Sequence, residues 1–209
     1  MKTFIFLNGG RSEGSFYKTH YLGAKGDGDI VICADGGFTL ARSLGVLPDL
    51  VIGDLDSVGS DIPEGVEVVR YPSEKDFSDF ELALDRALLM VPERIFVYGA
   101  LGGRLDHEVI NLVILAHLSV SASFVEQDVQ AHNAAGTLVL EGLGGRLCSL
   151  IAIGGPCRVE CTEGLRYPLR GEELKPSGRG LSNVITGDRA SIRVLRGKLL
   201  VIVVKSGGR

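Results

Sequence analysis

Two aspartates, Asp54 and Asp56, follow a short run of β-forming residues. On an extended stretch, residues two apart point the same way, so both carboxylates could share one hard cation. Magnesium prefers oxygen ligands, and proteins usually hold it by one or two carboxylates together with substrate phosphates. The pair therefore predicts a magnesium site, with a solvated turn as the structural alternative. Asp79 could add a third carboxylate, although the helix dipole also favours an acidic residue in a first helical turn.

Several other segments of the first half also carry polar or glycine-rich sequence just after a predicted strand. These segments are 8–11, 35–37, 53–57, 73–79 and 99–107. In a parallel sheet the carboxyl ends of the strands meet at one edge, and open α/β sheets bind their ligands there. Because five such segments share one edge, the sequence predicts a ligand site at that edge.

Phosphate is the ligand that the glycine–arginine segment favours. Gly102 and Gly103 offer backbone N–H groups beside the guanidinium of Arg104, and together they could cradle phosphate oxygens. Lys75 could neutralise the charge of a transferred phosphate, or it could be an ordinary exposed lysine. His107 could donate to a phosphate, carry a proton or simply occupy a first helical turn.

Two further aspartates are candidates for orienting a hydroxyl that attacks phosphorus. Asp106 is expected to cap the helix that follows it, which is its structural alternative. Asp106 or Asp76 is the candidate base, and geometry without substrate does not choose between them.

The elements that must position these residues form an α/β domain over residues 1–130, with a mainly parallel sheet. Strands are expected at 3–7, 30–34, 50–52, 66–70, 94–98 and 123–126. A helix should begin near Ser78, where Ser78 and Glu81 form a capping box, and Pro92 should end it. A second helix over about 108–118 is apolar nearly all round, so it is expected to be largely buried.

Residues 131–209 show a different pattern, which predicts an all-β sandwich domain, or else a small barrel. Short β-rich runs occur at 137–141, 146–153, 158–161, 190–195 and 198–204. Arg196 and Gly197 suggest a tight hairpin between the last two runs. Residues 170–180 combine glycine, proline and charge, and they are expected to form a mobile loop.

Composition limits the function classes. Residues 1–130 carry 10 Lys+Arg and 20 Asp+Glu, whereas residues 131–209 carry 12 and 6. The acidic first part argues against nucleic acid as a partner. No apolar run approaches the roughly 20 residues that span a bilayer, and the N-terminus does not resemble a signal peptide. We therefore expect no membrane partner and a cytoplasmic location, with the four cysteines reduced and serving as packing residues.

Common phosphate and hydrolase motifs are missing from the sequence. It has no G-x-x-x-x-G-K-[ST], which excludes a P-loop enzyme. No G-x-G-x-x-G follows the first predicted strand, which disfavours a dinucleotide-binding fold. G-x-S-x-G and H-E-x-x-H are also absent.

With these residues described, the sequence resembles the thiamine pyrophosphokinase family. The matching elements are Ala-Asp-Gly-Gly at 34–37, Gly-Asp-Leu-Asp-Ser at 53–57, Glu-Lys-Asp-Phe-Ser-Asp at 74–79 and Gly-Ala-Leu-Gly-Gly-Arg-Leu-Asp-His at 99–107. Each element is short, but four in this order are specific. In the second half, residues 164–169 and 181–183 resemble the substrate-side elements of the family.

The resemblance implies an N-terminal α/β domain, a C-terminal β-sandwich and a homodimer with its sites between subunits. It implies transfer of the terminal diphosphate of ATP to the hydroxyethyl oxygen of thiamine, with release of AMP. By position, the residues that would hold magnesium are Asp54, Asp56 and Asp79. Those that would contact the nucleotide, its phosphates or the reacting hydroxyl are Asp35, Gly36, Gly37, Lys75, Gly102, Gly103, Arg104, Asp106 and His107. Those that would contact thiamine are Ser182 and Asn183.

Other functions stay open at this point. The same chemistry could act on another hydroxymethyl heterocycle, such as a pterin. A D-x-D sequence also binds metal in nucleotide-sugar transferases, and the chain could instead be a nucleotide-binding module without catalysis.

Overall fold

A computed structural model describes residues 1–56 and 62–205 of the chain, so Ser57 of the Gly-Asp-Leu-Asp-Ser segment lies outside the described residues. The chain divides into two compact units. The first unit comprises Met1–Asn111 and Phe124–Gln127, and the second comprises Leu112–Ser123 and Asp128–Arg209. Across the described residues, no helix combines the length and apolarity needed to cross a membrane.

The first unit is built on a parallel sheet, as the sequence predicts. Its strands are β1 (Lys2–Phe6), β2 (Ile30–Ala34), β3 (Leu50–Gly53), β4 (Glu67–Arg70) and β5 (Arg94–Tyr98). They lie in the order β5-β1-β2-β3-β4, and each neighbouring pair is parallel. β1 therefore lies between β2 and β5, with Phe6 level with Cys33 on one side and Tyr98 on the other.

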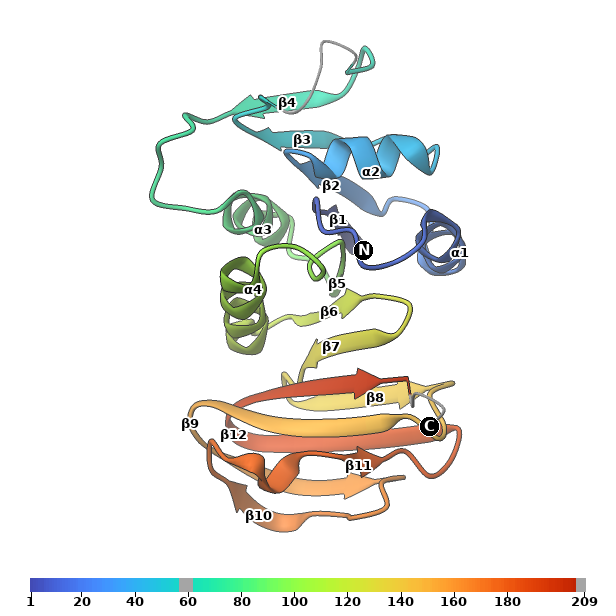
Figure 1. Cartoon of the computed structure of the whole chain (residues 1–209), viewed down its shortest axis with the longest axis vertical. Coiled ribbons are helices and arrows are strands. Elements are labelled where there is room, and N and C mark those ends of the chain that lie inside the picture. Colours follow the sequence, from blue (N-terminus) through green and yellow to red (C-terminus); the bar gives the residue numbers. More distant parts are fainter. Residues whose placement is uncertain (57–61, 206–209) are drawn as a thin grey trace. The chain divides into compact units, whose positions relative to one another are not determined.

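Helices cover both faces of this sheet (Figure 1). α1 (Gly14–Ala24) and α2 (Gly37–Ser43) lie on one face, and α3 (Asp79–Leu89) lies on the other. The chain moves in one direction from β1 to β4 and then returns to place β5 on the far side of β1. Because β-crossovers are right-handed, this reversal puts α3 on the opposite face. The reversal makes the space between β1 and β5 the topological switch point, where open α/β sheets bind ligands.

Aromatic side chains pack α1 against β1 and β5. Phe4 and Tyr21 meet edge to face with ring centroids 5.1 Å apart, and the rings of Phe6 and Tyr98 lie 4.9 Å apart. Tyr17 and Tyr98 are fully buried, with their ring centroids 5.7 Å apart. Such pairs add to the stabilisation from buried area. They fix the backbone of the two strands on either side of the switch point.

The helix predicted near Ser78 is confirmed. Ser78 is the N-cap of α3, its Oγ accepts from the Glu81 N–H at 3.2 Å, and the Ser78 N–H donates to Glu81 Oε2 at 2.9 Å. The capping box therefore forms in full, because both partners lie within one turn of the same segment.

The helix predicted at about 108–118 is present, but the prediction that it is largely buried is wrong. α4 (Leu105–His117) begins three residues earlier, and Leu105 and Val109 are 75% and 54% exposed. Asp106 is therefore in the first turn rather than at the N-cap, and its Oδ1 accepts from the His107 N–H at 3.1 Å. An apolar helix is buried only where other elements cover it, and the outer face of α4 is uncovered in the single chain.

The second unit is β-rich, and long bent strands replace several predicted short ones. Its strands are β7 (Val129–Asn133), β8 (Thr137–Glu141), β9 (Leu147–Glu163), β10 (Arg170–Leu174), β11 (Asn183–Val184) and β12 (Arg189–Val204), while β6 (Ser121–Val125) spans both units. The runs at 146–153 and 158–161 are one strand, β9. Residues 170–180 form β10, which pairs with β9, and a 3₁₀ turn at Gly178–Gly180, so the prediction of a mobile loop is wrong.

The predicted hairpin at Arg196 and Gly197 is also wrong, because β12 bends there and continues. Its first part pairs with β8, its last part pairs with β7, and β9 pairs with it along its length. The register shifts on both sides of Arg196, and Gly197 has a φ of +87°. A β-carbon at Gly197 would lie 2.6 Å from the carbonyl oxygen of Pro156. Bulges with glycine let a strand bend without ending.

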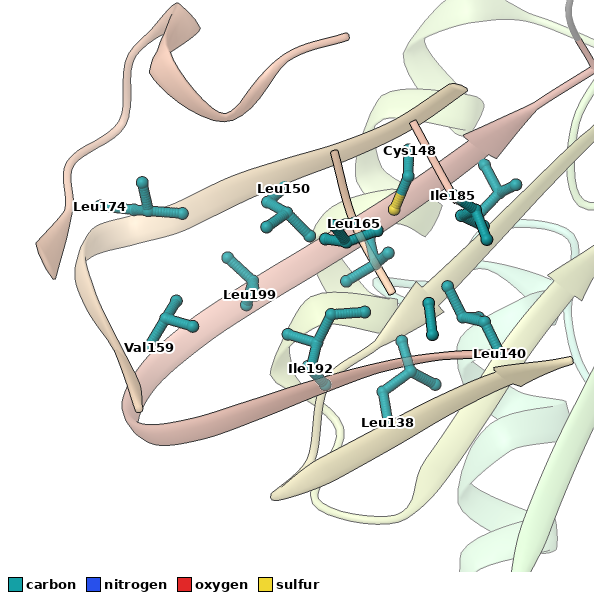
Figure 2. Packing of buried hydrophobic residues seen from close by; sticks show 14 of the residues in the cluster. Leu138, Leu140, Cys148, Leu150, Val159, Leu165, Leu174, Ile185, Ile192 and Leu199 are labelled. Atoms are coloured by element: carbon teal, nitrogen blue, oxygen red, sulfur yellow. The ribbon is translucent and has the colours of Figure 1, made fainter. Parts of the chain in front are cut away.

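A separate hydrophobic core holds the second unit together (Figure 2). Leu150, Val159, Ile192 and Leu199 come from β9 and β12 and point into it, and Leu138 of β8 faces them. Cys148 and Cys157 are buried in the same core, and all four cysteines are free, as expected from the sequence. Apolar burial therefore stabilises this unit without disulfides.

Asp29 should make the stability of the first unit depend on acid pH. Burial favours a raised pKa for this carboxyl. Hydrogen bonds from the N–H groups of Lys2 (2.7 Å) and Gly26 (2.8 Å), with the charge of Lys2, outweigh burial and hold the pKa below its ordinary value. Because the folded pKa is depressed, the stabilisation is present above the unfolded value of about 3.9 and is lost as pH falls through the folded pKa.

Asp29→Asn should therefore lower the free energy of unfolding at pH 7 by about 1–2 kcal/mol. Urea unfolding of the wild type and the variant at pH 7 and at pH 3 measures this. The difference between the two proteins should shrink at pH 3, and an equal difference at both pH values would contradict the role given to the Asp29 charge.

Candidate active site

A cavity of about 640 Å³ lies at the carboxyl ends of the strands in the first unit. Its wall is formed by the segments after β1, β2, β3 and β5, by the segment before α3 and by the start of α4. The predicted site residues on this wall are Asp35, Asp54, Lys75, Asp79, Gly103, Arg104 and His107. The structure thus brings seven predicted residues from four of the predicted segments to one cavity, at the edge of the sheet that the sequence predicts.

Backbone packing fixes the part of the wall at the switch point. The Leu7 N–H donates to the Tyr98 carbonyl at 2.9 Å, and the Gly9 N–H donates to the Gly99 carbonyl at 2.8 Å. A β-carbon on Gly9 would lie 2.3 Å from the Gly99 oxygen, and one on Gly99 would lie 2.5 Å from the Leu7 oxygen. Only glycine allows this approach. The segments after β1 and β5 therefore form one continuous backbone surface.

Asp35 and Asp54 come from neighbouring strands and share the wall. Asp35 has a φ of +42°, and its N–H donates to the Ile52 carbonyl at 2.8 Å. Gly53 permits this turn, because a β-carbon there would lie 3.1 Å from the Asp35 β-carbon. Positive φ is uncommon for a residue other than glycine and costs energy. The turn therefore places Asp35 beside the end of β3, and Asp35 and Asp54 line the same cavity.

The spacing of Asp54 and Asp56 suggests an extended stretch in which both carboxylates point the same way. This expectation is wrong. Leu55 between them has a φ of +61°, and the Asp56 N–H folds back to Asp54 Oδ1 at 3.2 Å. Asp54 is half-buried on the wall, whereas Asp56 is exposed and is not among the described residues that line the cavity. In this conformation, Asp54 is the member of the pair that the cavity presents to a ligand.

Lys75 and Asp79 form an ion pair on the cavity wall. Lys75 Nζ lies 2.9 Å from Asp79 Oδ1, and the two side chains are 12% and 34% exposed. Asp79 is also in the first turn of α3, where the helix dipole favours a negative charge. The Asp79 carboxylate therefore lies in the first turn of α3, pairs with Lys75 and lines the cavity.

Arg104 is paired with Asp106 near the cavity. Arg104 Nη2 lies 2.6 Å from Asp106 Oδ2, and this hydrogen bond lowers the pKa of Asp106 below its ordinary value. Asp106 and Asp76 are both exposed, and neither is among the described residues that line the cavity. A depressed pKa also makes Asp106 a weaker proton acceptor. The free chain thus does not present either predicted base to the cavity.

The glycines predicted to contact a nucleotide have different structural roles. A β-carbon at Gly36 would lie 2.6 Å from Asn8 Cγ, one at Gly37 1.9 Å from the Phe6 carbonyl oxygen, and one at Gly102 2.7 Å from Arg11 Cβ. Gly37 and Gly102 thus allow close packing against neighbouring backbone, and Gly36 allows close packing against the Asn8 side chain. In the part of the chain that the structure describes, nothing lies within 4 Å of a β-carbon at Gly103, which lines the cavity. Of the four, Gly103 is therefore the one whose backbone is free to meet phosphate.

Gly37→Ala and Gly103→Ala should separate the two roles. The clash with the Phe6 carbonyl should destabilise Gly37→Ala by at least about 2 kcal/mol. Gly103→Ala should unfold like the wild type while binding an ATP analogue more weakly, because its methyl group enters the cavity. Urea unfolding and calorimetric binding measure both effects. Equal stability of the two variants would contradict the packing role of Gly37.

Sequence reasoning missed several wall residues. Asn8, Phe77 and Asn111 all line the cavity. Asn111 is buried, and its Nδ2 donates to the Ala100 carbonyl at 3.3 Å, so it holds the segment after β5. Asn8 lies just after β1, as Asp35 lies just after β2, so its place in the sequence indicates a site residue in the same way. Phe77 is 55% exposed and adds an exposed aromatic ring to the wall.

Ser182 and Asn183 lie in the second unit. The Asn183 side chain is engaged with the backbone of Tyr167, since its Oδ1 accepts from the N–H at 3.0 Å and its Nδ2 donates to the carbonyl at 2.7 Å. Ser182 is exposed and has a φ of +58°. Asn183 also borders a cavity of about 230 Å³ together with Tyr167 and Leu181. Asn183 thus shapes that cavity by fixing the backbone at Tyr167.

The fold and the cavity define a two-part protein, with a doubly wound α/β unit that has a charged site at its switch point and a β-rich second unit. Two family descriptions match these parts. The description "Thiamin pyrophosphokinase, catalytic domain" matches residues 25–126, and "Thiamin pyrophosphokinase, vitamin B1 binding domain" matches residues 137–199. The chain belongs to the thiamine pyrophosphokinase family, and the resemblance found in the sequence is confirmed.

Individual relatives agree with this assignment. Thiamine pyrophosphokinase 1 of Arabidopsis thaliana is 27% identical over 183 residues, which cover 77% of this chain and 67% of that protein. Thiamine pyrophosphokinase of Bacillus subtilis (strain 168) is 35% identical over 89 residues, covering 40% of this chain and 42% of the relative. The crystal structure of thiamine pyrophosphokinase from Bacillus subtilis superposes with a TM-score of 0.83 at 22% identity and covers 99% of this chain and 100% of that one. This last likeness shows the fold.

Proposed function

We propose that this chain transfers the diphosphate group of ATP to thiamine, giving thiamine diphosphate and AMP. The observation that carries the proposal is the cavity at the switch point, where Asp35, Asp54, Lys75, Asp79 and Arg104 line one wall. Carboxylates that can hold a cation, next to cations that can neutralise phosphate, are what phosphoryl-type transfer requires. Membership of the family supplies thiamine as the acceptor.

Magnesium is part of the proposal, and the donor set fits it. Asp35 and Asp54 offer carboxylate oxygens from neighbouring strands, and Asp79 offers a third on the same wall. Within residues 1–56 and 62–205, no group of three His, Cys, Asp or Glu side chains could hold a metal ion. Magnesium is usually held by one or two carboxylates together with water and substrate phosphates. When bound, it would neutralise charge on the phosphate oxygens of ATP.

Different residues of the wall would have different roles in the transfer. The thiamine hydroxyl would attack the β-phosphorus of ATP in line with the leaving AMP oxygen, a reaction that depends mainly on positioning and charge neutralisation. Lys75 and Arg104 would stabilise the charge that develops on the transferred group. The backbone N–H of Gly103 would contact a phosphate oxygen, and His107 at the start of α4 would donate to another. Orientation of the hydroxyl would fall to Asp76 or Asp106.

Asp76 and Asp106, the bases expected from the sequence, would have to move to reach the cavity. Binding often tightens catalytic geometry that is loose without substrate, so either could still take this part in the complex. Asp106 would first have to release Arg104, to which it is bonded at 2.6 Å.

The second unit is proposed to contribute to the binding of thiamine. The vitamin B1 binding description covers residues 137–199, which include Ser182 and Asn183. Ser182 is exposed and can offer its hydroxyl to a ligand, whereas Asn183 would act through the backbone at Tyr167, which it holds. The cytoplasm is the proposed location, which the four free cysteines support.

A homodimer is also proposed, and α4 supports it. Leu105 and Val109 are one turn apart on this helix, so they share a face, and they are 75% and 54% exposed. Apolar surface of this kind often marks an interface between proteins. Val109→Glu should shift the sedimentation coefficient from that of a dimer to that of a monomer in analytical ultracentrifugation. A wild type that sediments as a monomer at micromolar concentration would contradict the homodimer.

Product analysis with an acceptor panel tests the function. Purified protein with ATP and magnesium should form AMP and thiamine diphosphate in equal amounts when thiamine is present. A hydroxymethyl pterin should give no product, and a sugar nucleotide should not replace ATP. ADP as the nucleotide product, or faster turnover with the pterin, would overturn the proposal.

A further inference from the structure

A buried carboxyl group that the proposed transfer does not use lies in the first unit. Glu126 follows β6 directly, is 0% exposed and is not among the described residues that line the cavity. A carboxyl group that is fully buried is costly unless other groups satisfy its oxygens. The groups that surround the Glu126 carboxyl therefore decide how its burial is tolerated.

One hydroxyl group from the segment after β1 and one from α1 donate to the same oxygen of Glu126. Ser12 Oγ donates to Oε2 at 2.5 Å, and the Tyr17 hydroxyl donates to the same oxygen. Ser12 Oγ also accepts from the N–H of Gln127 at 2.8 Å, so it links the segment after β1 to the segment after β6. Tyr17 is fully buried on α1, and burial and the neighbouring Glu126 raise its pKa, so it remains a donor.

The segment after β5 approaches the same carboxyl group. Among the described residues Oε1 of Glu126 has no hydrogen-bond partner, and the backbone N–H groups of Gly99 and Leu101 act to lower the pKa of the carboxyl. Burial opposes this effect, and it is the largest influence on the pKa of Glu126, which is raised. Glu126 therefore accepts from Ser12 and Tyr17, while the segment after β5 influences its charge.

These two segments are the ones that form the cavity wall at the switch point. Leu7, Asn8 and Gly9 line it from β1, and Gly99 and Ala100 line it from β5. Their mutual backbone bonds, described above, fix the distance between them. Glu126 adds a tie behind the wall, through contacts that span 114 and 109 residues of sequence.

We propose that Glu126 is a positioning residue for the nucleotide: its carboxyl group fixes the segment after β1, whose backbone bonds hold the segment after β5 in the arrangement that receives the phosphates. The inference rests on the proposed function for the identity of the ligand. A shift of about 1 Å in groups that position a substrate can cost roughly a hundredfold in rate. Loosening these segments should therefore weaken the use of ATP more than the use of thiamine.

Glu126→Gln is the first test variant, because it keeps the size of the side chain but removes one acceptor oxygen. The measurements are the dissociation constant for α,β-methylene-ATP by calorimetry, the KM values for ATP and for thiamine, and the melting temperature. The expected result is a rise of about tenfold or more in the dissociation constant and in the KM for ATP, with the KM for thiamine changed less than twofold.

If Glu126→Gln folds poorly, two other variants test the same hydrogen bonds. Tyr17→Phe and Ser12→Ala each remove one donor to Glu126, and each should raise the dissociation constant in the same direction by a smaller factor. Tyr21→Phe is the control, because Tyr21 lies one turn further along α1 in the same aromatic core, and its hydroxyl makes none of these contacts. It should bind the analogue as the wild type does.

Two outcomes would overturn the inference. One is a lower melting temperature in Glu126→Gln with unchanged analogue binding and unchanged KM values, which would show a purely structural role. The other is an equal loss of binding in Tyr21→Phe and Tyr17→Phe. Failure of the proposed function is distinguishable, because the wild type would then bind or turn over nucleotide without forming thiamine diphosphate.

Discussion

Asp54→Asn should lower kcat/KM for the transfer by at least about a hundredfold, which corresponds to about 2.7 kcal/mol of transition-state stabilisation. Asp54 is the member of the Asp54–Asp56 pair that lines the cavity. The amide keeps the shape of the side chain, and its oxygen can still accept from the Asp56 N–H, which now lies 3.2 Å from Asp54 Oδ1. The substitution thus removes a negative charge that magnesium would use while leaving the turn intact.

The rate of AMP release over a range of magnesium concentrations measures this effect. The variant should also need a higher magnesium concentration for half-maximal rate. Asp85→Asn is the matched control, because Asp85 is exposed on α3 and away from the cavity wall. A variant at Asp54 that keeps a third or more of the wild-type rate, with the same magnesium dependence, would contradict the metal role.

Lys75→Met should have the second largest effect, a loss of about 10²–10³-fold in kcat. Lys75 is only 12% exposed on the cavity wall, so its charge acts in surroundings where water screens it poorly. Its removal has two consequences of the same sign. The transferred group loses a cation, and Asp79, which lies 2.9 Å from Lys75 Nζ, is left with an unpaired negative charge beside the phosphates.

Single-turnover kinetics with saturating ATP separates this loss from weaker binding. Lys75→Arg should recover part of the rate, because it restores the charge without the shape of the ammonium group. Lys18→Met on the exposed side of α1 is the control for the loss of a lysine. Activity of Lys75→Met within threefold of the wild type would show that Lys75 serves only as the ion-pair partner of Asp79.

Local signals in the sequence predict the first unit well. The capping box of Ser78 and Glu81 forms because both partners lie in one turn. The parallel sheet follows from apolar runs that alternate with helices, and the edge that carries the site follows from the polar segments after those runs. These features depend on residues that are close in sequence, so the sequence pattern is enough to predict them.

Features that depend on tertiary packing could not be predicted in this way. Gly37 and Gly103 look alike in sequence, but the Phe6 carbonyl fills the space at one and nothing fills it at the other. β12 bends at Gly197, between the part that pairs with β8 and the part that pairs with β7. The local sequence alone does not distinguish such a bulge from a turn. Glu126 belongs to none of the motifs that the sequence reveals, because its partners are more than 100 residues away.

The conformation around Asp54 shows the same limit at the site itself. Spacing places two carboxylates two residues apart, but the positive φ of Leu55 turns Asp56 away from the cavity wall. Asp35, from the neighbouring strand, lines the cavity together with Asp54. In the proposed magnesium site, Asp35 therefore supplies the second carboxylate in place of Asp56.

Transfer of labelled phosphate from ATP tests the proposed function most directly. The protein is incubated with magnesium, thiamine and ATP labelled with ³²P at either the β- or the γ-position, and the products are separated. Attack on the β-phosphorus predicts that both labels move to thiamine diphosphate and that AMP carries neither. A product labelled only from the γ-position, with the β-label left in ADP, would show phosphoryl transfer and contradict the proposal.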